Sequence, residues 1–170
     1  MKQLFIIDGY FFLYRAWHAY ASMNRSDGPS HNMVYGFWRM IIHLLALKPD
    51  QMVIVRDSIG KVSREDILPT YKANRASMPD DFRQQISLCK SLCTQLGIPS
   101  KEQTGYEADD IIYTLAKNYP STQITQGDTW RYIIYSADKD LKQILEFDHV
   151  LIRDPIKEDE WNKASFQRSF

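Results

Sequence analysis

Four short runs of unbroken apolar residues, rich in β-branched and aromatic side chains, constrain the fold of this chain more than any other feature. They span residues 4–7, 52–55, 132–135 and 150–152. An unbroken apolar run is typical of a strand that is covered on both faces, as in a parallel sheet. The sequence therefore predicts a mainly parallel sheet built from these four runs.

Helical patterns separate the apolar runs. Residues 10–20, 33–47, 82–96 and 108–118 are rich in apolar side chains, which in the last two recur at three- and four-residue steps. Strands that alternate with helices form right-handed βαβ units. We expect an α/β fold with helices flanking the sheet. A length of 170 residues suits a single domain over residues 1–170.

Carboxylates follow three of the four predicted strands. They are Asp8, Asp57, Asp138 and Asp140. In an open parallel sheet, ligands bind in the crevice beyond the carboxyl ends of the strands. Three further acids, Glu107, Asp109 and Asp110, open the helix predicted over 108–118, where acidic residues also stabilise a helix N-terminus. The spacing therefore predicts that seven carboxylates converge at one edge of the sheet.

Convergence of seven carboxylates requires neutralisation. Two unit charges about 4 Å apart repel by about 4 kcal/mol at an effective dielectric near 20, and several such pairs exceed a typical domain stability of roughly 5–15 kcal/mol. Either some of the acids are protonated or cations neutralise them. A set of oxygen ligands without His or thiolate favours Mg²⁺ or Mn²⁺. One or two such ions are expected, and a pair about 4 Å apart supports phosphoryl displacement.

The segment over residues 58–81 carries the complementary charge. It contains no long apolar run, and its basic and aromatic side chains are Lys61, Arg64, Tyr71, Lys72 and Arg75. We expect a mobile basic excursion that contacts a polyanionic substrate; without the carboxylates, a solvated charged loop would be the better interpretation. The 21 basic and 21 acidic residues cancel, which excludes a chain-wide polycation.

Eight stretches of the chain resemble one known family. The sequence is similar, in the family's order from about residue 3 to 155, to the 5′-to-3′ exonuclease domain of bacterial DNA polymerase I. That domain is a member of the flap-endonuclease (5′-nuclease) family and has a PIN-like, Rossmann-like fold. The matching stretches are residues 5–9, 13–19, 34–37, 71–75, 78–81, 96–99, 105–112 and 137–141.

The resemblance implies an activity and a role for individual residues. It implies divalent-metal-dependent hydrolysis of DNA phosphodiesters near 5′ ends or flap junctions; DNA rather than RNA is implied by the resemblance alone. It assigns the metal-binding cluster to Asp8, Asp57, Glu107, Asp109, Asp110, Asp138 and Asp140. Lys72 and Arg75 match catalytic residues of the family's helical arch, and Arg15, Arg64 and Tyr71 are expected to bind substrate.

The chain departs from the family pattern at several points. Tyr10 and Phe11 stand where small hydroxyl residues are usual, Arg56 replaces a usual Phe, and Asn32 a usual Gly. The sequence ends about where the family begins its helix–three-turn–helix region, which grips duplex DNA and supplies further aspartates. An excised fragment, half of a split enzyme and a reduced relative that relies on a separate partner segment all stay open. The alternative function is a catalytically impaired branched-DNA-binding or scaffolding module.

Other signals are weaker. No secretory or membrane-spanning run is present, and Cys89 and Cys93 favour a reduced pair, so we expect a cytoplasmic protein without a membrane partner. The histidines show no catalytic spacing; His18 is expected to be packed or half-exposed. The Trp and Tyr residues over 10–20 and 33–47 recur at helical steps, which favours core packing over base stacking.

Overall fold

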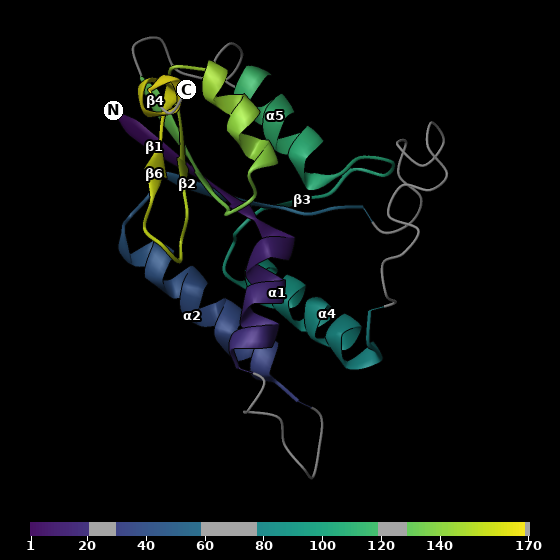
Figure 1. The fold of residues 1–170 in the computed structure, drawn as a ribbon. Coiled ribbons are helices and arrows are strands. Elements are labelled where there is room, and N and C mark those ends of the chain that lie inside the picture. The colour runs from purple at the N-terminus through teal and green to yellow at the C-terminus, as the bar shows by residue number, and fades with distance from the viewer. Residues whose placement is uncertain (21–29, 59–77, 119–128, 169–170) are drawn as a thin grey trace.

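The computed structural model describes residues 1–20, 30–58, 78–118 and 129–168, and these form one six-stranded sheet with helices on both faces (Figure 1). The strands are β1 (Lys2–Asp8), β2 (Gln51–Val55), β3 (Ser100–Lys101), β4 (Trp130–Tyr135), β5 (Val150–Arg153) and β6 (Glu160–Trp161). The helices are α1 (Gly9–Ala19), α2 (Asn32–Ala46), α4 (Asp80–Gln95), α5 (Ala108–Asn118) and α6 (Lys163–Gln167), with a 3₁₀ helix, η3 (Asp140–Glu146).

The four predicted strands and four predicted helices are all present, with ends within two residues of the expected ones. The additional elements are β3 and β6, of two residues each, and the short helices η3 and α6. Two-residue strands carry no periodic pattern, because they form only where a neighbouring strand offers a partner. The predicted basic excursion falls largely on residues 59–77, which lie outside the described residues.

The strand order indicates where a ligand crevice is expected. The order is β3-β2-β1-β4-β5-β6, and every neighbouring pair is parallel except β5 and β6. The chain fills one half of the sheet from β1 to β3 and the other from β4 to β6, so the order reverses between β1 and β4. In such sheets ligands bind beyond the carboxyl ends of the strands at this reversal. Asp8 ends β1, and Asp138 follows β4 by three residues.

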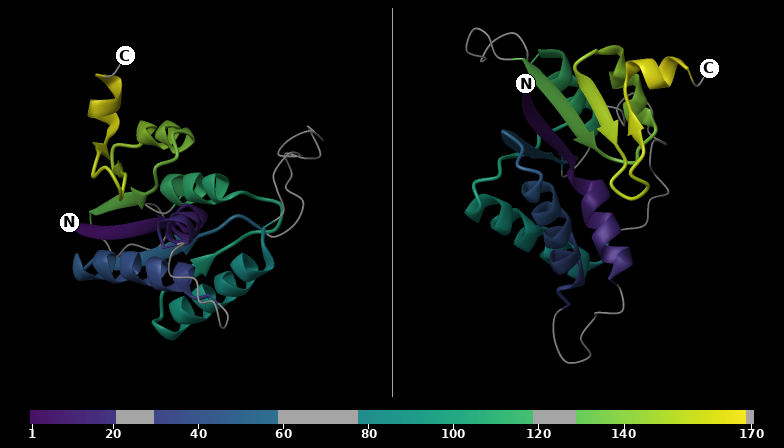
Figure 2. Two further views of the ribbon diagram at one scale, coloured as in Figure 1. Left: turned by 60° about the horizontal axis from the view of Figure 1, so that its bottom comes forward. Right: turned by 90° about the vertical axis from the view of Figure 1, so that its left-hand side faces the viewer.

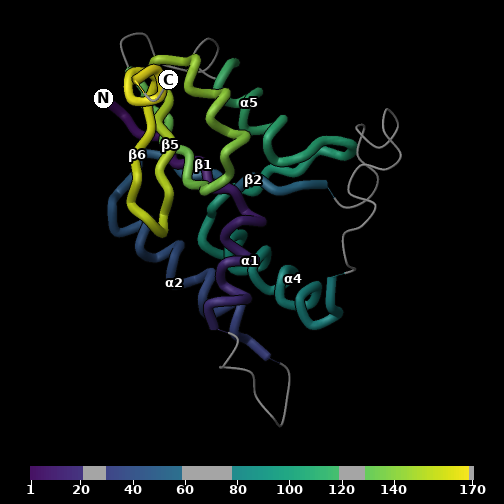
Figure 3. Tube along the Cα trace, viewed as in Figure 1, coloured from purple at the N-terminus to yellow at the C-terminus, as the bar shows by residue number. Residues whose placement is uncertain are grey.

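Alternate side chains of β1 are buried on opposite faces of the sheet. Phe5 and Ile7 of β1 pack in a core with α1, α2 and α4, whereas Leu4 and Ile6 pack in a second core with α5 and η3. This alternation is the two-residue period of a strand. Figure 2 shows the helical layers on opposite sides of the sheet, and Figure 3 follows the same path as a tube.

A polar network joins α1, α2 and α4 on the first of these faces. Gln85 of α4 is buried, and its Oε1 accepts hydrogen bonds from the N–H groups of Met33 (2.9 Å) and Val34 (3.3 Å) in the first turn of α2. Its Nε2 donates to Oδ1 of Asn32 (3.0 Å), and Asn32 in turn donates to the carbonyl oxygen of Trp17 (3.1 Å). A side chain from α4 thus satisfies the N-terminal N–H groups of α2, which otherwise lack a helical partner.

Candidate metal centre

A cleft of about 550 Å³ opens at the carboxyl ends of β1, β2 and β4. Five of the seven predicted acidic residues line it: Asp8, Asp57, Glu107, Asp109 and Asp138. They come from the end of β1, the segment after β2, the start of α5 and the segment after β4. Parallel strands and the N-terminus of α5 therefore bring together carboxylates that are up to 130 positions apart in the sequence (138 − 8). We call this hollow the carboxyl-end cleft.

Asp8 is one of two buried carboxylates of the cleft, the other being Glu107. Its side chain caps α1 by accepting a hydrogen bond from the N–H of Phe11 (3.1 Å), and its other oxygen accepts one from the Ser136 hydroxyl (2.8 Å). Burial raises the pKa of Asp8 to about 6, and the neighbouring charges of Asp57 and Asp138 act in the same direction, while the two hydrogen bonds oppose them. The fold thus holds the Asp8 carboxyl group where burial destabilises its ionised form.

Asp109 reports most directly on the crowding of negative charge. Its pKa is raised to about 7, first by burial and then by four neighbouring carboxylates. These are Asp138, Asp8, Asp57 and Glu107. Every other acid of the carboxyl-end cleft therefore lies within electrostatic range of Asp109.

Backbone N–H groups hold two of the remaining carboxylates. Asp57 accepts a hydrogen bond from the N–H of Ala108, the first residue of α5 (2.7 Å), and Asp138 accepts one from the N–H of Asp140 (2.9 Å). Ser136 accepts a bond from the N–H of Asp138 (3.1 Å) while it donates to Asp8. This serine links the two central acids, and the sequence analysis missed it, because a serine between a strand and an acid carries no pattern of its own.

Two predicted ligands do not line the carboxyl-end cleft. Asp110 turns back on its own helix start, where its Oδ2 accepts a hydrogen bond from the N–H of Glu107 (3.1 Å). Asp140 is exposed at the first residue of η3. Within the described stretches, moreover, no three His, Cys, Asp or Glu side chains are already arranged so that they could hold a metal ion. The metal-binding role of all seven acids stays a prediction.

Helix α1 forms the opposite wall of the cleft. The lining side chains from this helix are Tyr10, Phe11, Tyr14, Arg15 and His18. The tyrosine rings lie with centroids 6.2 Å apart, and the ring of Tyr14 stacks at 4.8 Å on Phe82 of α4. Burial, followed by the charge of Asp57, raises the pKa of Tyr10, so its hydroxyl keeps its proton and can donate.

The Trp and Tyr residues of α1 and α2 are predicted to pack in the core, and the structure corrects this for Tyr14 and Tyr35, which are 41% and 43% exposed. His18 is exposed and lines the cleft, rather than being packed or half-exposed. The available signal was the four-residue spacing of Tyr10, Tyr14 and His18, which places them on one face of a helix that starts directly after Asp8. Phe12 and Leu13, on another face, do enter the core.

The predicted substrate-contacting residues are divided between the described and the undescribed parts of the chain. Arg15 is exposed and lines the cleft. Lys72, Arg75, Arg64 and Tyr71 lie outside the described residues.

Comparison with known sequences identifies relatives over the whole described fold. The family model for the 5′-3′ exonuclease N-terminal, resolvase-like domain matches residues 3–170. A 5′-3′ exonuclease of Aquifex aeolicus is 36% identical over 171 residues, which cover 100% of this chain and 57% of that protein. The thermostable DNA polymerase I of Thermus aquaticus is 34% identical over 143 residues, covering 84% of this chain and 16% of the polymerase. The chain thus spans only part of the length of these relatives.

Solved structures share the fold. The T5 D15 protein, co-crystallised with metal ions, superposes with a TM-score of 0.75 at 20% identity and covers 99% of this chain and 60% of that one. The catalytic core of Rad2 in complex with a DNA substrate gives a TM-score of 0.58 at 18% identity, with 98% and 48% covered. Taken with the match over residues 3–170, the chain belongs to the family of 5′-3′ exonuclease N-terminal, resolvase-like domains.

Proposed function

We propose that this chain is the catalytic part of a divalent-metal-dependent 5′ nuclease, which hydrolyses DNA phosphodiesters near 5′ ends or at flap junctions. One observation carries the proposal: five carboxylates from distant segments line a single cleft at the reversal point of a parallel sheet. The relatives support it, since one is named a 5′-3′ exonuclease and solved structures of the same fold are described with metal ions or with DNA.

The donor set of the carboxyl-end cleft fits Mg²⁺ or Mn²⁺, because it consists of carboxylate oxygen atoms. Burial first, and the neighbouring carboxylates after it, raise the pKa of Asp8 and Asp109, so a bound cation would relieve the cost of their charge. We propose one or two such ions. The residues that would hold them are Asp8, Asp57, Glu107, Asp109 and Asp138, with Asp110 and Asp140 completing the predicted set. When bound, a divalent ion supplies a water of lowered pKa and neutralises charge on the phosphate.

The chain's own residues prepare the carboxyl-end cleft for a polyanion. Ser136 and the N–H of Phe11 fix the orientation of Asp8, so its carboxylate stays directed at one place. Arg15 lines the α1 wall of the cleft and is proposed to bind the substrate backbone. Lys72 and Arg75 are proposed to steer the scissile phosphate, and Arg64 and Tyr71 to contact the 5′ strand.

The proposal includes a partner. We propose that a separate segment supplies the duplex-gripping helix–three-turn–helix region, because relatives of this chain extend well beyond the matched part.

A cytoplasmic location is proposed as well. In the part of the chain that the structure describes, no helix has the length and apolar character needed to cross a membrane.

The direct test is cleavage of a 5′-flap duplex with Mn²⁺ or Mg²⁺, with and without a helix–three-turn–helix segment supplied in trans. The proposal expects metal-dependent cleavage that disappears in Asp109→Asn. Asp148→Asn makes the same chemical change at a remote surface carboxylate that pairs with Lys163 (3.0 Å), so its activity should equal that of the unmodified protein. Absence of any metal-dependent cleavage, even with the added segment, would overturn the proposal.

A second candidate is a branched-DNA-binding or scaffolding module without turnover. It is favoured by one observation, that no group of acids among the described residues is already arranged to hold a metal ion. This candidate expects flap-DNA affinity that survives Asp109→Asn but falls in Lys72→Ala and Arg75→Ala. A nuclease instead loses cleavage in Asp109→Asn, so the same set of variants separates the two functions.

A further inference from the structure

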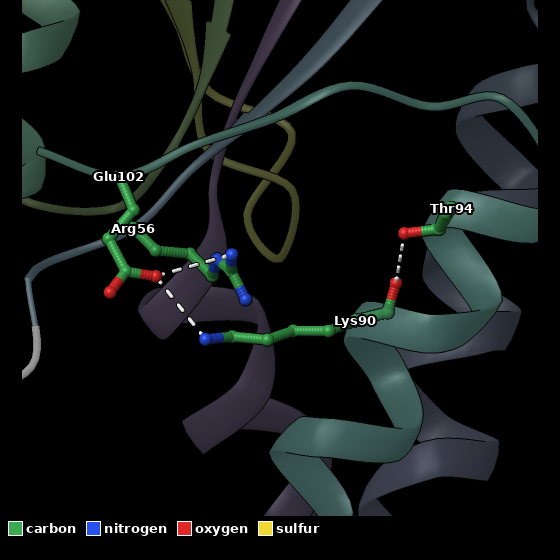
Figure 4. A network of polar contacts seen from close by, with 4 residues as sticks. All are labelled: Arg56, Lys90, Thr94 and Glu102. Atoms are coloured by element: carbon green, nitrogen blue, oxygen red, sulfur yellow. Dashed lines mark hydrogen bonds and ion pairs between the residues drawn. The ribbon is translucent and has the colours of Figure 1, made fainter.

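A cluster of two cations and one carboxylate lies next to the carboxyl-end cleft. Nη2 of Arg56 and Nζ of Lys90 each lie 3.3 Å from the same oxygen, Oε2 of Glu102. Figure 4 shows both cationic side chains reaching this oxygen from different elements. Arg56 follows β2, Lys90 belongs to α4, and Glu102 follows β3. We call these three residues the Arg56 cluster; none of them lines the cleft.

The side chain of Arg56 supports the residue that follows Asp8. A Cβ atom built on Gly9 would lie 2.6 Å from Cγ of Arg56 and 2.8 Å from the carbonyl oxygen of Val55. Gly9 is therefore in close contact with the stem of Arg56 at the point where β1 becomes α1. The stem of Arg56 therefore lies directly against the backbone that carries Asp8.

The Arg56 cluster also joins the two segments that carry three other acids of the cleft, Asp57, Glu107 and Asp109. The N–H of Arg56 donates to the carbonyl oxygen of Lys101 (2.9 Å), and the N–H of Ser58 donates to that of Tyr106 (3.2 Å). Between these bonds, Asp57 accepts from the N–H of Ala108. The ion pair between Arg56 and Glu102 joins the same two segments through their side chains. The segment of Arg56 leads to Asp57, and the segment of Glu102 leads to Glu107 and Asp109.

The burial of Arg56 indicates a geometric role rather than a stabilising one. Its side chain is only 12% exposed, and its Nε finds no hydrogen-bond partner among the described residues. The Glu102 side chain is 26% exposed, so the Arg56 end of the ion pair carries most of the burial. A pair of this kind seldom stabilises a fold more than apolar residues do, but removing one partner is costly because the buried guanidinium charge loses its carboxylate. Such a pair holds its segments at one separation.

We propose that Arg56 is a positioning residue, which acts through Glu102 and Gly9 to set the separation of Asp8, Asp57 and Asp109 and thereby the affinity of the cleft for divalent ions. This inference rests on the proposed function. Lys90 extends the arrangement to α4, so the helix that packs against α1 shares the same anchor. Residues that orient metal ligands from outside typically change metal affinity by about 10- to 100-fold when removed.

The test is Mn²⁺ binding to the metal-free protein, measured by calorimetry well below the melting temperature and accompanied by thermal unfolding. Arg56→Met, which keeps the stem but not the charge, should weaken Mn²⁺ binding by about tenfold or more. Arg56→Lys should recover part of the affinity, because Lys can still pair with Glu102. Glu160→Gln breaks an Arg–Glu pair with Arg153 at β6, remote from the cleft, and should bind Mn²⁺ like the unmodified protein.

The double variant Arg56→Met/Glu102→Gln separates positioning from general damage. If Arg56 acts through Glu102, the double variant binds Mn²⁺ no more weakly than Arg56→Met alone. Should Arg56→Met fail to fold, Glu102→Gln decides the matter, and it too should weaken binding. A folded Arg56→Met with lowered melting temperature but unchanged Mn²⁺ affinity overturns the inference. If the unmodified protein itself binds no Mn²⁺, the proposed function fails first.

Discussion

Two hollows of nearly equal size lie at opposite ends of the same sheet. The carboxyl-end cleft measures about 550 Å³ and the second about 520 Å³. The second, which we call the amino-end groove, is formed at the starts of β1 and β2. Its lining includes Leu4, Leu45, Pro49, Asp50, Met52, Leu96, Gly97, Pro99, Lys101 and Leu115. The two hollows therefore have similar volumes but different linings: five carboxylates line the carboxyl-end cleft, and mainly apolar residues line the amino-end groove.

The difference shows that strand direction, rather than the size of a hollow, decides where chemistry gathers in this fold. Among the described residues, Asp50 is the one acid that lines the amino-end groove, and it accepts a hydrogen bond from the N–H of Gln3 (2.7 Å). At the other end, burial and then the neighbouring carboxylates raise the pKa of Asp8 and Asp109. Such perturbed groups cluster at functional sites.

The largest contrast is between two Asp→Asn changes. Asp8→Asn should reduce both Mn²⁺ affinity and metal-dependent cleavage at least about 100-fold, since outer residues alone account for about 10- to 100-fold. Asp50→Asn keeps an acceptor for the N–H of Gln3 and should leave both quantities unchanged. Calorimetry and a flap-cleavage assay measure the two effects. Equal losses in the two variants would mean that the cleft has no special role.

The next contrast concerns two glycines. Gly9→Ala should destabilise the protein by about 1–3 kcal/mol, because the added methyl group meets Arg56 and the carbonyl oxygen of Val55. Gly97 lines the amino-end groove at a φ of 68° with nothing within 4 Å of an added Cβ, so Gly97→Ala should cost only the backbone strain of about 1 kcal/mol. Urea unfolding at one pH gives both values. A smaller cost at Gly9 than at Gly97 would contradict the close packing described for β1 and α1.

Ser136→Ala tests the link between Asp8 and Asp138. Loss of the hydroxyl leaves a buried carboxylate oxygen without its donor, so Mn²⁺ affinity should fall about tenfold. Ser136→Thr keeps a hydroxyl and should retain more of the affinity than Ser136→Ala. Titration of each variant with Mn²⁺ measures the effect; identical affinities for all three proteins would remove Ser136 from the site.

The pH dependence of stability should also originate at the carboxyl-end cleft. The pKa values of Asp8 and Asp109 are raised from 3.8 to about 6 and about 7, so the folded metal-free protein binds more protons than the unfolded chain between these values. Stability from these groups is present at low pH and is lost as pH rises through the folded-state pKa values. The melting temperature should therefore fall between pH 5 and pH 7.5, by roughly 2–4 °C for each kcal/mol of stability lost, and Asp109→Asn should flatten the change. A flat profile in the unmodified protein would be inconsistent with this crowding.

The smallest effect is expected in the amino-end groove. Leu96 is 47% exposed at its rim, so Leu96→Ser should change stability by no more than about 0.5 kcal/mol. Mn²⁺ binding and cleavage should not change. A loss of cleavage in Leu96→Ser would show that the two ends of the sheet are coupled.

Much of this architecture follows from the sequence by itself. Unbroken apolar runs gave β1, β2, β4 and β5, because a strand covered on both faces needs apolar residues at every position. The same logic placed Asp8, Asp57 and Asp138 at one edge, since parallel strands all end on the same side. The acids that open α5 are also visible in the sequence itself, and the family resemblance assigns the same residues to the metal-binding cluster.

Other features depend on tertiary contacts that no local pattern encodes. The sequence analysis counted Asp110 with the converging acids, but its side chain bonds to the nearby N–H of Glu107 instead of entering the cleft. Ser136 and the Arg56 cluster were missed, because their partners are far away in the sequence. Tyr14 was misplaced, because an aromatic residue at helical spacing looks the same on a core face and on a cleft wall.

The hydrogen bonds from Gln85 to the first turn of α2 have a consequence for biosynthesis. Met33 leaves the ribosome 52 residues before its acceptor, an interval of about 3–10 s at ordinary elongation rates. During that interval the nascent helix has no acceptor for these N–H groups. Its amino end can be completed only when α4 arrives, so this layer is expected to assemble late and as a unit rather than helix by helix.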